Sequence, residues 1–353
     1  MDGIEAAASC RKARGYGRGQ RRARGAAVLA LAGLALFLGA SVEGRALAQA
    51  AAPAKLDFAG SVTWFGQVPV MVAVDKGYFK EQGLDVEIQV ILSSSDRIAA
   101  LTAGSVAFSN LGRVAVIAEM ARGNKNFYYF ANIDDSPGNE GCWARPGFAS
   151  FGDLKGKKVA ANTSAEITMN GLLRAAGMSV KDIQFVNLPP NEMAGAIAKG
   201  DVDAACVWQP LLEGVKQAAP GGKLLGTDMD TDSYKKYGTM ASPDIVIISR
   251  KLVDEHPDQA QKLAAAMFKG ADLAIKNPEE AAKTVAHYFK KTPEEVLASM
   301  KSFKYFGLDG WSDHMKLHEQ QMQELADWLY DTNKIDNKPD VAKWMSVGFI
   351  PKS

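Results

Sequence analysis

Apolar residues follow two different spacings along most of this chain, and each change of spacing marks a change of element. Residues 62–64 end a strand-like stretch, and residues 68–76 place apolar side chains at helical spacing up to Gly77. The same criterion predicts further strands at 84–91, 106–109 and 127–133, and helices at 95–104 and 112–122. Strands and helices that alternate in this way predict a mostly parallel sheet with helices on both faces.

A polar, turn-rich segment at 134–140 interrupts this order, and the order then starts again. The second series consists of strands at 158–161, 183–188 and 202–207, with helices at 166–176 and 191–199. One more apolar strand is expected at 244–249, and from Asp254 the pattern is almost wholly helical. The pattern therefore predicts an α/β protein with two lobes, two chain crossings that form a hinge, and a helical C-terminal extension on the first lobe.

The expected division gives residues 55–142 and 245–353 to the first lobe and residues 143–244 to the second. Residues 1–48 are expected to be a signal peptide that is removed. This segment has a basic start, a charge-free apolar run from Ala26 to Ala40, and small residues before the cut at Ala48. Because the run is shorter than the roughly 20 residues that span a bilayer, we expect export to the periplasm. Cys10 precedes the apolar run, so a lipid anchor is not expected. The choice between the general and the twin-arginine export route stays open.

Charge excludes one class of partner. The whole chain is formally +1, and removal of eight basic and three acidic residues with the leader leaves 33 basic and 37 acidic residues, or −4. Nucleic-acid binding needs clustered Lys and Arg, and no basic stripe is visible. Two cysteines, Cys142 and Cys206, remain in the exported part. An oxidising compartment permits a bond between them, but the sequence leaves open whether they pair.

Candidate binding residues follow from the rule that ligands of open α/β sheets lie beyond the carboxyl ends of the strands. The helices that begin there also offer unpaired N–H groups to an anion. The candidates are Trp64, Gln67, Asn110, Gly112, Arg113, Asn162, Thr163, Ser164, Trp208 and Gln209. The competing interpretation is that each polar residue only caps a helix and that each Trp lies in the hydrophobic core.

The sequence resembles the periplasmic binding proteins for taurine, aliphatic sulfonates and nitrate. These belong to a superfamily that also contains thiamine-precursor proteins. The resemblance rests on Ala73–Val86, Ala99–Gly104, Asp153–Val159, Val186–Pro190, Gly200–Pro210 and Asp244–Lys251. It implies the two-lobed fold of type II periplasmic binding proteins. It also implies that Asp244 faces a ligand ammonium group and that the helix after Asn110 binds a sulfonate. Trp208 is then expected to line the cleft between the lobes.

Two segments depart from the taurine pattern. Gly112–Ala115 stands where that pattern has Gly-Ser-Ser-Pro, and Asn162–Glu166 stands where it has Ser-Thr-Thr-His. The new Arg113 and Glu166 form either a mutual salt bridge or contacts to a different zwitterion, with Arg113 taking a carboxylate. Trp64, Trp208 and Asp244 can also hold a methylated ammonium by cation–π contact.

The resemblance implies a monomeric solute-binding component of an ABC importer, which closes about its hinge on a small sulfonate or zwitterion and is read by the importer's membrane subunits. The alternatives are a different amine, betaine or carboxylate zwitterion, presentation of ligand to a membrane sensor, and, more remotely, a thiamine-precursor synthase-like enzyme. Neither a cofactor nor a metal is expected. The four histidines, His256, His287, His314 and His318, lie outside the predicted cleft strands, and His314 and His318 are expected to be solvated.

Overall fold

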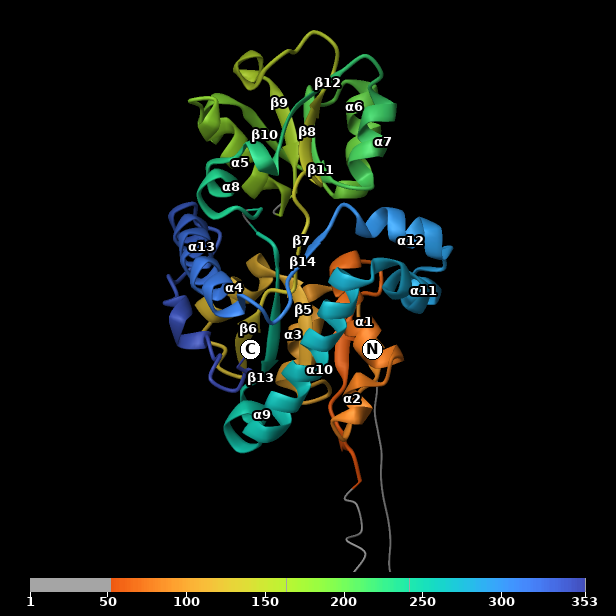
Figure 1. Cartoon of the computed structure of the whole chain (residues 1–353). Helices are drawn as coiled ribbons and strands as arrows, with labels where there is room; N and C mark the ends of the chain where they lie inside the picture. The colour runs from red at the N-terminus through yellow and green to blue at the C-terminus, as the bar shows by residue number, and fades with distance from the viewer. Residues whose placement is uncertain (1–51, 163, 241, 353) are drawn as a thin grey trace, which may run out of the picture. The chain divides into compact units, whose positions relative to one another are not determined.

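The computed structural model describes residues 52–162, 164–240 and 242–352, so the expected leader and Thr163 lie outside the described residues. Two five-stranded sheets organise the described part, in the orders β4-β2-β5-β13-β6 and β10-β9-β11-β8-β12 (Figure 1). We call each sheet with its covering helices a lobe. The strands of the first lobe are β2 (Phe58–Gly60), β4 (Ile88–Val90), β5 (Phe108–Gly112), β6 (Phe127–Ala131) and β13 (Asp244–Ser249). Those of the second are β8 (Glu140–Ala144), β9 (Lys158–Ala161), β10 (Gln184–Asn187), β11 (Ala204–Trp208) and β12 (Lys223–Thr227).

The two sheets share one topology. In the first lobe β2 pairs in parallel with β4 and β5, whereas β13 is antiparallel to β5 and β6. In the second lobe β9 pairs in parallel with β10 and β11, whereas β8 is antiparallel to β11 and β12. The reversed strand of each sheet is the one that arrives from the other lobe. It begins at the edge where the parallel strands end, so both sheets are mixed.

Helices of the first lobe cover its sheet and form the expected C-terminal extension. They are α1 (Val68–Asp75), α2 (Tyr78–Glu81), α3 (Ser94–Thr102), α4 (Arg113–Ala121), α9 (Arg250–Glu255), α10 (Pro257–Lys276), α11 (Pro278–Phe289), α12 (Pro293–Met300) and α13 (Trp311–Asp331). Helix α10 packs closely on α1 because Gly270 has no side chain: a Cβ there would lie 2.1 Å from the carbonyl oxygen of Pro69. The core includes Phe58, Phe108 and Ile247, all fully buried.

The second lobe buries both faces of its sheet. Its helices are α5 (Ala165–Ala175), α6 (Met193–Lys199), α7 (Leu211–Ala218) and α8 (Asp232–Tyr237). One apolar cluster includes Leu172 on α5 with Val159 on β9, and another includes Ile197 on α6 with Val215 on α7. Burial on both faces explains why the central strand β11 is apolar throughout.

The question left open for the two cysteines has an answer in the structure. Cys142 on β8 and Cys206 on β11 are register partners in adjacent antiparallel strands, with 4.0 Å between their Cα atoms, and form a disulfide. Both are fully buried in the core of the second lobe.

Two short segments connect the lobes, between β6 and β8 and between α8 and β13. In the first, β7 (Asp134–Asp135) pairs with β14 (Lys304–Tyr305); the two-residue strands β1 (Ala54–Lys55) and β3 (Leu84–Asp85) pair elsewhere. Because β8 belongs to the second sheet, the first connection between the lobes ends before Glu140, where β8 begins. The division into lobes at 142/143 and 244/245 stays a proposal. No helix among the described residues is both long enough and apolar enough to cross a membrane.

Candidate ligand-binding site

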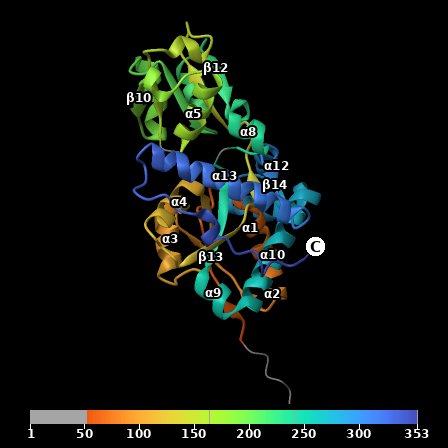
Figure 2. The same ribbon diagram turned by 90° about the vertical axis from the view of Figure 1, so that its left-hand side faces the viewer.

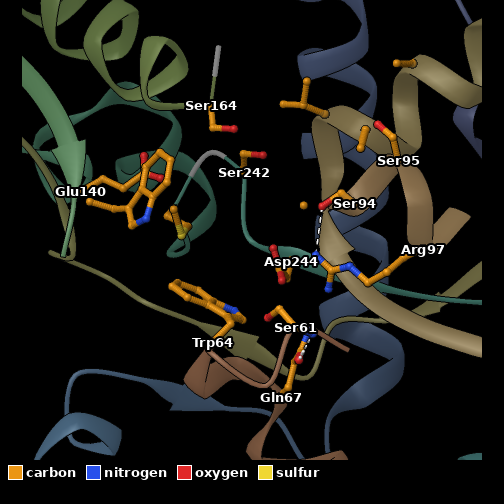
Figure 3. Close-up of a pocket in the computed structure, with 16 residues that line it drawn as sticks. Ser61, Trp64, Gln67, Ser94, Ser95, Arg97, Glu140, Ser164, Ser242 and Asp244 are labelled. Carbon is orange, nitrogen blue, oxygen red and sulfur yellow. Dashed lines mark hydrogen bonds between the residues drawn. The ribbon is translucent and has the colours of Figure 1, made fainter. Parts of the chain in front are cut away.

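A cavity of about 460 Å³ lies where the parallel strands of the two sheets end (Figure 3). Six of the expected site residues line it: Trp64, Gln67, Gly112, Ser164, Trp208 and Asp244. They come from both lobes. Lining residues that the sequence did not indicate include Ser61, Ser94, Ser95, Arg97, Glu140, Met240 and Ser242. We call this cavity the cleft.

Arg97 supplies a buried cation to the cleft. It lies one turn into α3, with only 6% of its surface exposed. Its Nη1 donates to the backbone oxygen of Asn110 at 2.8 Å, and its Nη2 donates to Ser94 Oγ at 3.1 Å. Its Nε is buried and has no hydrogen-bond partner among the described residues. Burial lowers the pKa of Arg97, but a guanidinium stays charged at neutral pH.

Asp244 supplies the opposite charge. It begins β13 and lies in register with Gly112, so that a Cβ at Gly112 would be 3.7 Å from Asp244 Oδ1. The surrounding protein raises its pKa to about 6 by desolvation, while Arg97 and Arg113 counter part of that effect. In Figure 3 the Asp244 carboxyl lies between Trp64 on one side and Arg97 on the other. One cavity therefore presents a carboxylate and a guanidinium together.

Three helices of eight residues or more direct their amino ends to the cleft. Ser94 and Ser95 open α3, Gly112 caps α4, and Ser164 precedes α5. Gly112 has no side chain that could occupy the free N–H groups of the first turn of α4. Unpaired N–H groups and the positive ends of helix dipoles attract anions. Together with Arg97 they form an electropositive side of the cleft.

Two tryptophans line the cleft. The Trp64 indole Nε1 donates to Asp134 Oδ2 at 3.2 Å, and its ring packs edge-on against Phe303 with 4.8 Å between ring centroids. Trp208 ends β11, where it is the register partner of Glu140. Both rings are only partly buried, so they offer apolar surface to a ligand.

Glu140 adds a second carboxyl, at the start of β8. Burial raises its pKa to about 7, against the opposing effect of a hydrogen bond from the Thr168 hydroxyl. Glu140 ends the segment that the sequence predicts to be a polar turn, so its place in the cleft was not expected.

Gln67 lines the cleft, and Asn110 supports it from behind. The Gln67 Nε2 donates to the Asn110 carbonyl oxygen at 3.0 Å, the same oxygen that Arg97 uses. The side chain of Asn110 is buried and donates to Asp134 Oδ1 at 3.1 Å. The carbonyl oxygen of Asn110 therefore holds the side chains of Gln67 and Arg97 in place, although the side chain of Asn110 does not line the cleft.

Arg113 and Glu166 do not form the mutual salt bridge that was one of two expectations. Arg113 is fully buried, its Nη1 donates to Gln321 Oε1 at 2.7 Å, and its Nη2 contacts His318 Nδ1. Glu166 pairs instead with Lys334, at 2.7 Å. Neither residue lines the cleft. Helix α13 supplies the partners of Arg113, and the segment after α13 supplies Lys334, at sequence separations of 208 and 168 for Gln321 and Lys334.

The structure corrects the expectation that His318 is solvated, since it is 1% exposed against Arg113. Burial and that guanidinium lower the pKa of His318 to about 2, so the ring is neutral.

The two remaining candidates do not line the cleft. Asn162 Oδ1 accepts from the Ala165 N–H at 2.9 Å and so caps α5. Gln209 lines a neighbouring cavity. None of the four histidines, all within the described residues, lines the cleft.

The chain is similar to known binding proteins over most of its length. One relative is a Brucella abortus (strain 2308) protein whose name describes it as a binding protein without stating a ligand. The two sequences are 28% identical over 243 residues, which are 68% of this chain and 73% of that protein. The chain is 28% identical over 296 residues, or 81% of this chain and 84% of the relative, to a Bacillus subtilis (strain 168) protein whose name assigns it to aliphatic sulfonates. It is 26% identical over 218 residues, or 60% and 64%, to the taurine-binding periplasmic protein of Escherichia coli (strain K12).

Solved structures show the same fold. The periplasmic aliphatic sulphonate binding protein of Escherichia coli superposes with a TM-score of 0.66 at 17% identity, covering 84% of this chain and 92% of that chain.

Enzymes are also among the relatives. A Schizosaccharomyces pombe 4-amino-5-hydroxymethyl-2-methylpyrimidine phosphate synthase is 23% identical over 252 residues, 69% of this chain and 72% of that enzyme. The family model described as NMT1/THI5 like matches residues 64–281, more than half of the chain. The two-lobed fold and this match together place the chain in the NMT1/THI5-like family.

Proposed function

We propose that this protein is the extracytoplasmic solute-binding component of an ABC importer, and that it captures a small aminosulfonate such as taurine between its lobes. The observation that carries the proposal is the pair of opposite charges, Arg97 and Asp244, facing one cleft. The sulfonate would contact Arg97 and the amino ends of α3 and α4, and the ammonium would contact Asp244. The relatives named for taurine and aliphatic sulfonates support this class of ligand.

The mechanism is closure of the two lobes about the two crossings. Cleft residues come from both lobes, with Asp244 and Arg97 from the first and Ser164 and Trp208 from the second. A ligand that contacts both stabilises the closed arrangement by its differential affinity for it. The importer's membrane subunits would recognise that arrangement in the periplasm.

A different small amine, a betaine or a carboxylate zwitterion is the second candidate. Within this group Glu140 favours a small amine, because a second carboxyl in the cleft suits a ligand that carries more positive charge than taurine. Trp64 and Trp208 offer ring faces to a methylated ammonium. An enzymatic role has less support, because no described histidine lines the cleft.

Calorimetric titration of the purified protein with four probes tests these alternatives. Taurine carries both groups, ethanesulfonate lacks the amine, β-alanine replaces the sulfonate by a carboxylate, and glycine betaine carries a methylated ammonium. We expect taurine to bind roughly ten to a hundred times more tightly than ethanesulfonate, because a hydrogen bond to a charged group contributes about 1.5–3 kcal/mol. In Asp244→Asn that difference should disappear.

Tighter binding of β-alanine or betaine than of taurine would assign the protein to the second candidate. An Asp244→Asn protein that still prefers taurine would remove Asp244 from ammonium recognition. If none of the four probes binds at millimolar concentration, the proposed ligand class is wrong.

A further inference from the structure

The second crossing, between α8 and β13, is held from two sides at Met240. The Met240 N–H donates to Asp135 Oδ1 at 3.3 Å, and its carbonyl oxygen accepts from Gln321 Nε2 at 2.9 Å. Asp135 belongs to the first crossing, and Gln321 belongs to α13. Met240 also lines the cleft. This one residue therefore contacts the ligand cavity, the other crossing and α13.

Arg113 determines how the amide of Gln321 is oriented. A guanidinium group only donates hydrogen bonds, so the Gln321 atom that faces Arg113 Nη1, at 2.7 Å, must be the oxygen. The Thr239 hydroxyl donates to the same oxygen at 3.2 Å. The amide nitrogen then faces the carbonyl oxygen of Met240, and it also donates to Ser233 Oγ of α8 at 3.1 Å. Arg113, which does not line the cleft, thus acts on the second crossing through Gln321.

Helix α13 is a fixed part of the first lobe. Its residues Met322, Ala326 and Leu329 lie in the core of that lobe. The helix lies between α4 of the first lobe and α8 of the second (Figure 2). Gln321 itself is only 2% exposed. Its hydrogen bond to Met240 therefore anchors the second crossing to the body of the first lobe.

This anchor favours one arrangement of the lobes over others. Rotation of one lobe against the other changes the backbone of the segments that connect them. A rotation that moves Met240 away from α13 breaks the hydrogen bond and leaves the buried amide of Gln321 without its acceptor, which is costly. The contact is thus made in the arrangement in which both lobes line the cleft.

We infer that Gln321 is a positioning residue, which holds the ligand-free protein in that arrangement by anchoring Met240. The inference deepens the proposed function and rests on it, because it names what regulates closure around the same site. Its effect on the shape of the ligand-free protein is measured without any ligand.

Gln321→Glu tests the anchor with little change in side-chain shape. The carboxylate still accepts from Arg113 and Thr239, but it places an oxygen against the carbonyl oxygen of Met240. Arg113 stabilises the ionised form of this carboxylate, so the two oxygens repel each other. In small-angle X-ray scattering we expect a larger radius of gyration than in the ligand-free wild type, and a return to the wild-type value when both proteins are saturated with taurine.

Affinity for taurine should fall in the same variant. A lost hydrogen bond shifts an equilibrium by about two- to tenfold, and the apparent affinity decreases with the population that is competent to bind. A role confined to stability would lower the melting temperature without a change in radius that ligand reverses. Gln321→Met is a second test, because it removes the donor without adding a charge and should shift the radius in the same direction.

Two control variants identify the contact that matters. Gln320→Glu makes the same chemical change at the preceding, exposed residue of α13 and should alter neither the radius nor the affinity. Ser233→Ala removes the contact of Gln321 with α8 but keeps its contact with Met240, so both quantities should stay close to those of the wild type.

A wild-type radius in both ligand-free Gln321 variants overturns the inference. An effect of Ser233→Ala as large as that of Gln321→Glu also overturns it, because α8 would then be the anchored element. Tighter taurine binding by Gln321→Glu overturns it as well, since Gln321 would then hold the lobes apart. If taurine does not bind the wild type, the proposed ligand is wrong, and the scattering of the ligand-free proteins still decides whether Gln321 is the anchor.

Discussion

At the scale of single residues, the chemistry of the cleft depends on how far the fold has removed each charged group from water. Desolvation by the surrounding protein raises the pKa of Asp244 to about 6, although the guanidinium groups of Arg97 and Arg113 act to lower it. Asp134, which accepts from Trp64 and Asn110, has a pKa raised further by burial and by Asp244. Asp244 is therefore ionised at neutral pH but titrates close to it.

This property predicts a pH dependence for an amine ligand. The ammonium needs ionised Asp244, so affinity for taurine should be constant above pH 7 and should fall as pH decreases through 6. At pH 5 the expected loss is about tenfold, since about one Asp244 in ten is ionised one unit below a pKa of about 6. Titrations at pH 5, 6, 7 and 8 measure it, with Asp244→Asn as the control that should show no such loss. A loss in Asp244→Asn that begins near pH 7 would assign the titration to Glu140, whose pKa is about 7.

Sequence reasoning found the cleft residues that follow strands but not those whose placement depends on distant packing. Trp64 follows β2 and Trp208 ends β11, and topology alone brings the carboxyl ends of parallel strands together. Asp244, at the start of β13, was indicated only by the resemblance. Arg97 was missed because it lies inside a helix, although its spacing of three from Ser94 places it on the face of α3 that begins at the cleft. The direction of Arg113 depends on α13, and nothing near Arg113 in the sequence indicates that contact.

At the scale of elements, the amino end of α4 is suited to bind an anion because its N-cap residue, Gly112, has no side chain. Gly112 precedes α4 at φ −62°, a conformation open to any residue, so the backbone does not require glycine there. The absent side chain instead leaves the first-turn N–H groups open toward Asp244 and the cleft.

Gly112→Asn should separate stability from binding. Asn is among the best N-cap residues and exceeds Gly by only a few tenths of a kcal/mol, so thermal stability should hold or rise slightly. Its amide would occupy the N–H groups and the space that the sulfonate needs, and affinity for taurine should fall at least tenfold. Melting curves and titrations on the same sample measure both quantities. Unchanged affinity would place the sulfonate away from α4.

The disulfide is an element-scale feature because it joins two neighbouring strands of the second lobe. The bond closes a loop with a sequence separation of 64. In the Cys142→Ala/Cys206→Ala protein we expect a loss of about 2–4 kcal/mol of unfolding free energy, chiefly because the unfolded chain gains freedom. A reductant should lower the melting temperature of the wild type and leave the double variant unchanged. A wild-type melting curve that does not respond to reductant would mean that the bond is not formed in solution.

Several elements escaped sequence prediction for reasons of local composition. Strand β8 begins at Glu140, directly after a run of acids and turn formers that is typical of an exposed loop. The fold buries Asp134 and Asp135 of that run, each to 1% exposure, through hydrogen bonds from Trp64, Asn110, Ser136 and Met240. Strand β12 has a single fully buried residue, and the burial along it does not alternate. Both elements depend on tertiary partners.

At the scale of the whole described molecule, α13 and the segment after it connect the lobes in addition to the two crossings. Helix α13 contacts α8 of the second lobe and lies beside the first-lobe helix α4 in Figure 2. Gln321 Nε2 donates to Ser233 Oγ at 3.1 Å, and Lys334 pairs with Glu166 at 2.7 Å. Glu166 follows Ser164 of the cleft by two residues, so this ion pair supports the arrangement in which both lobes line one cavity.

Lys334→Met tests whether that ion pair contributes to binding. The change leaves Glu166, whose side chain is only 7% exposed, without its cation, and removing one partner of a buried pair is costly. If the pair favours the arrangement that binds ligand, affinity for taurine should fall several-fold, because the competent population decreases. Lys316→Met is the matched control, since it removes an exposed pair with Asp313 within α13.

The double variant Lys334→Met/Glu166→Gln separates the two ways in which the pair can act. It removes the buried charge together with its partner, so the folded state no longer contains an uncompensated carboxylate and much of the stability should return. The contact between the lobes is still absent, so affinity should stay low if the pair sets the equilibrium between arrangements. Full recovery of affinity along with stability would instead mean that Lys334 acts only by neutralising Glu166, and that the two crossings alone determine how the lobes close.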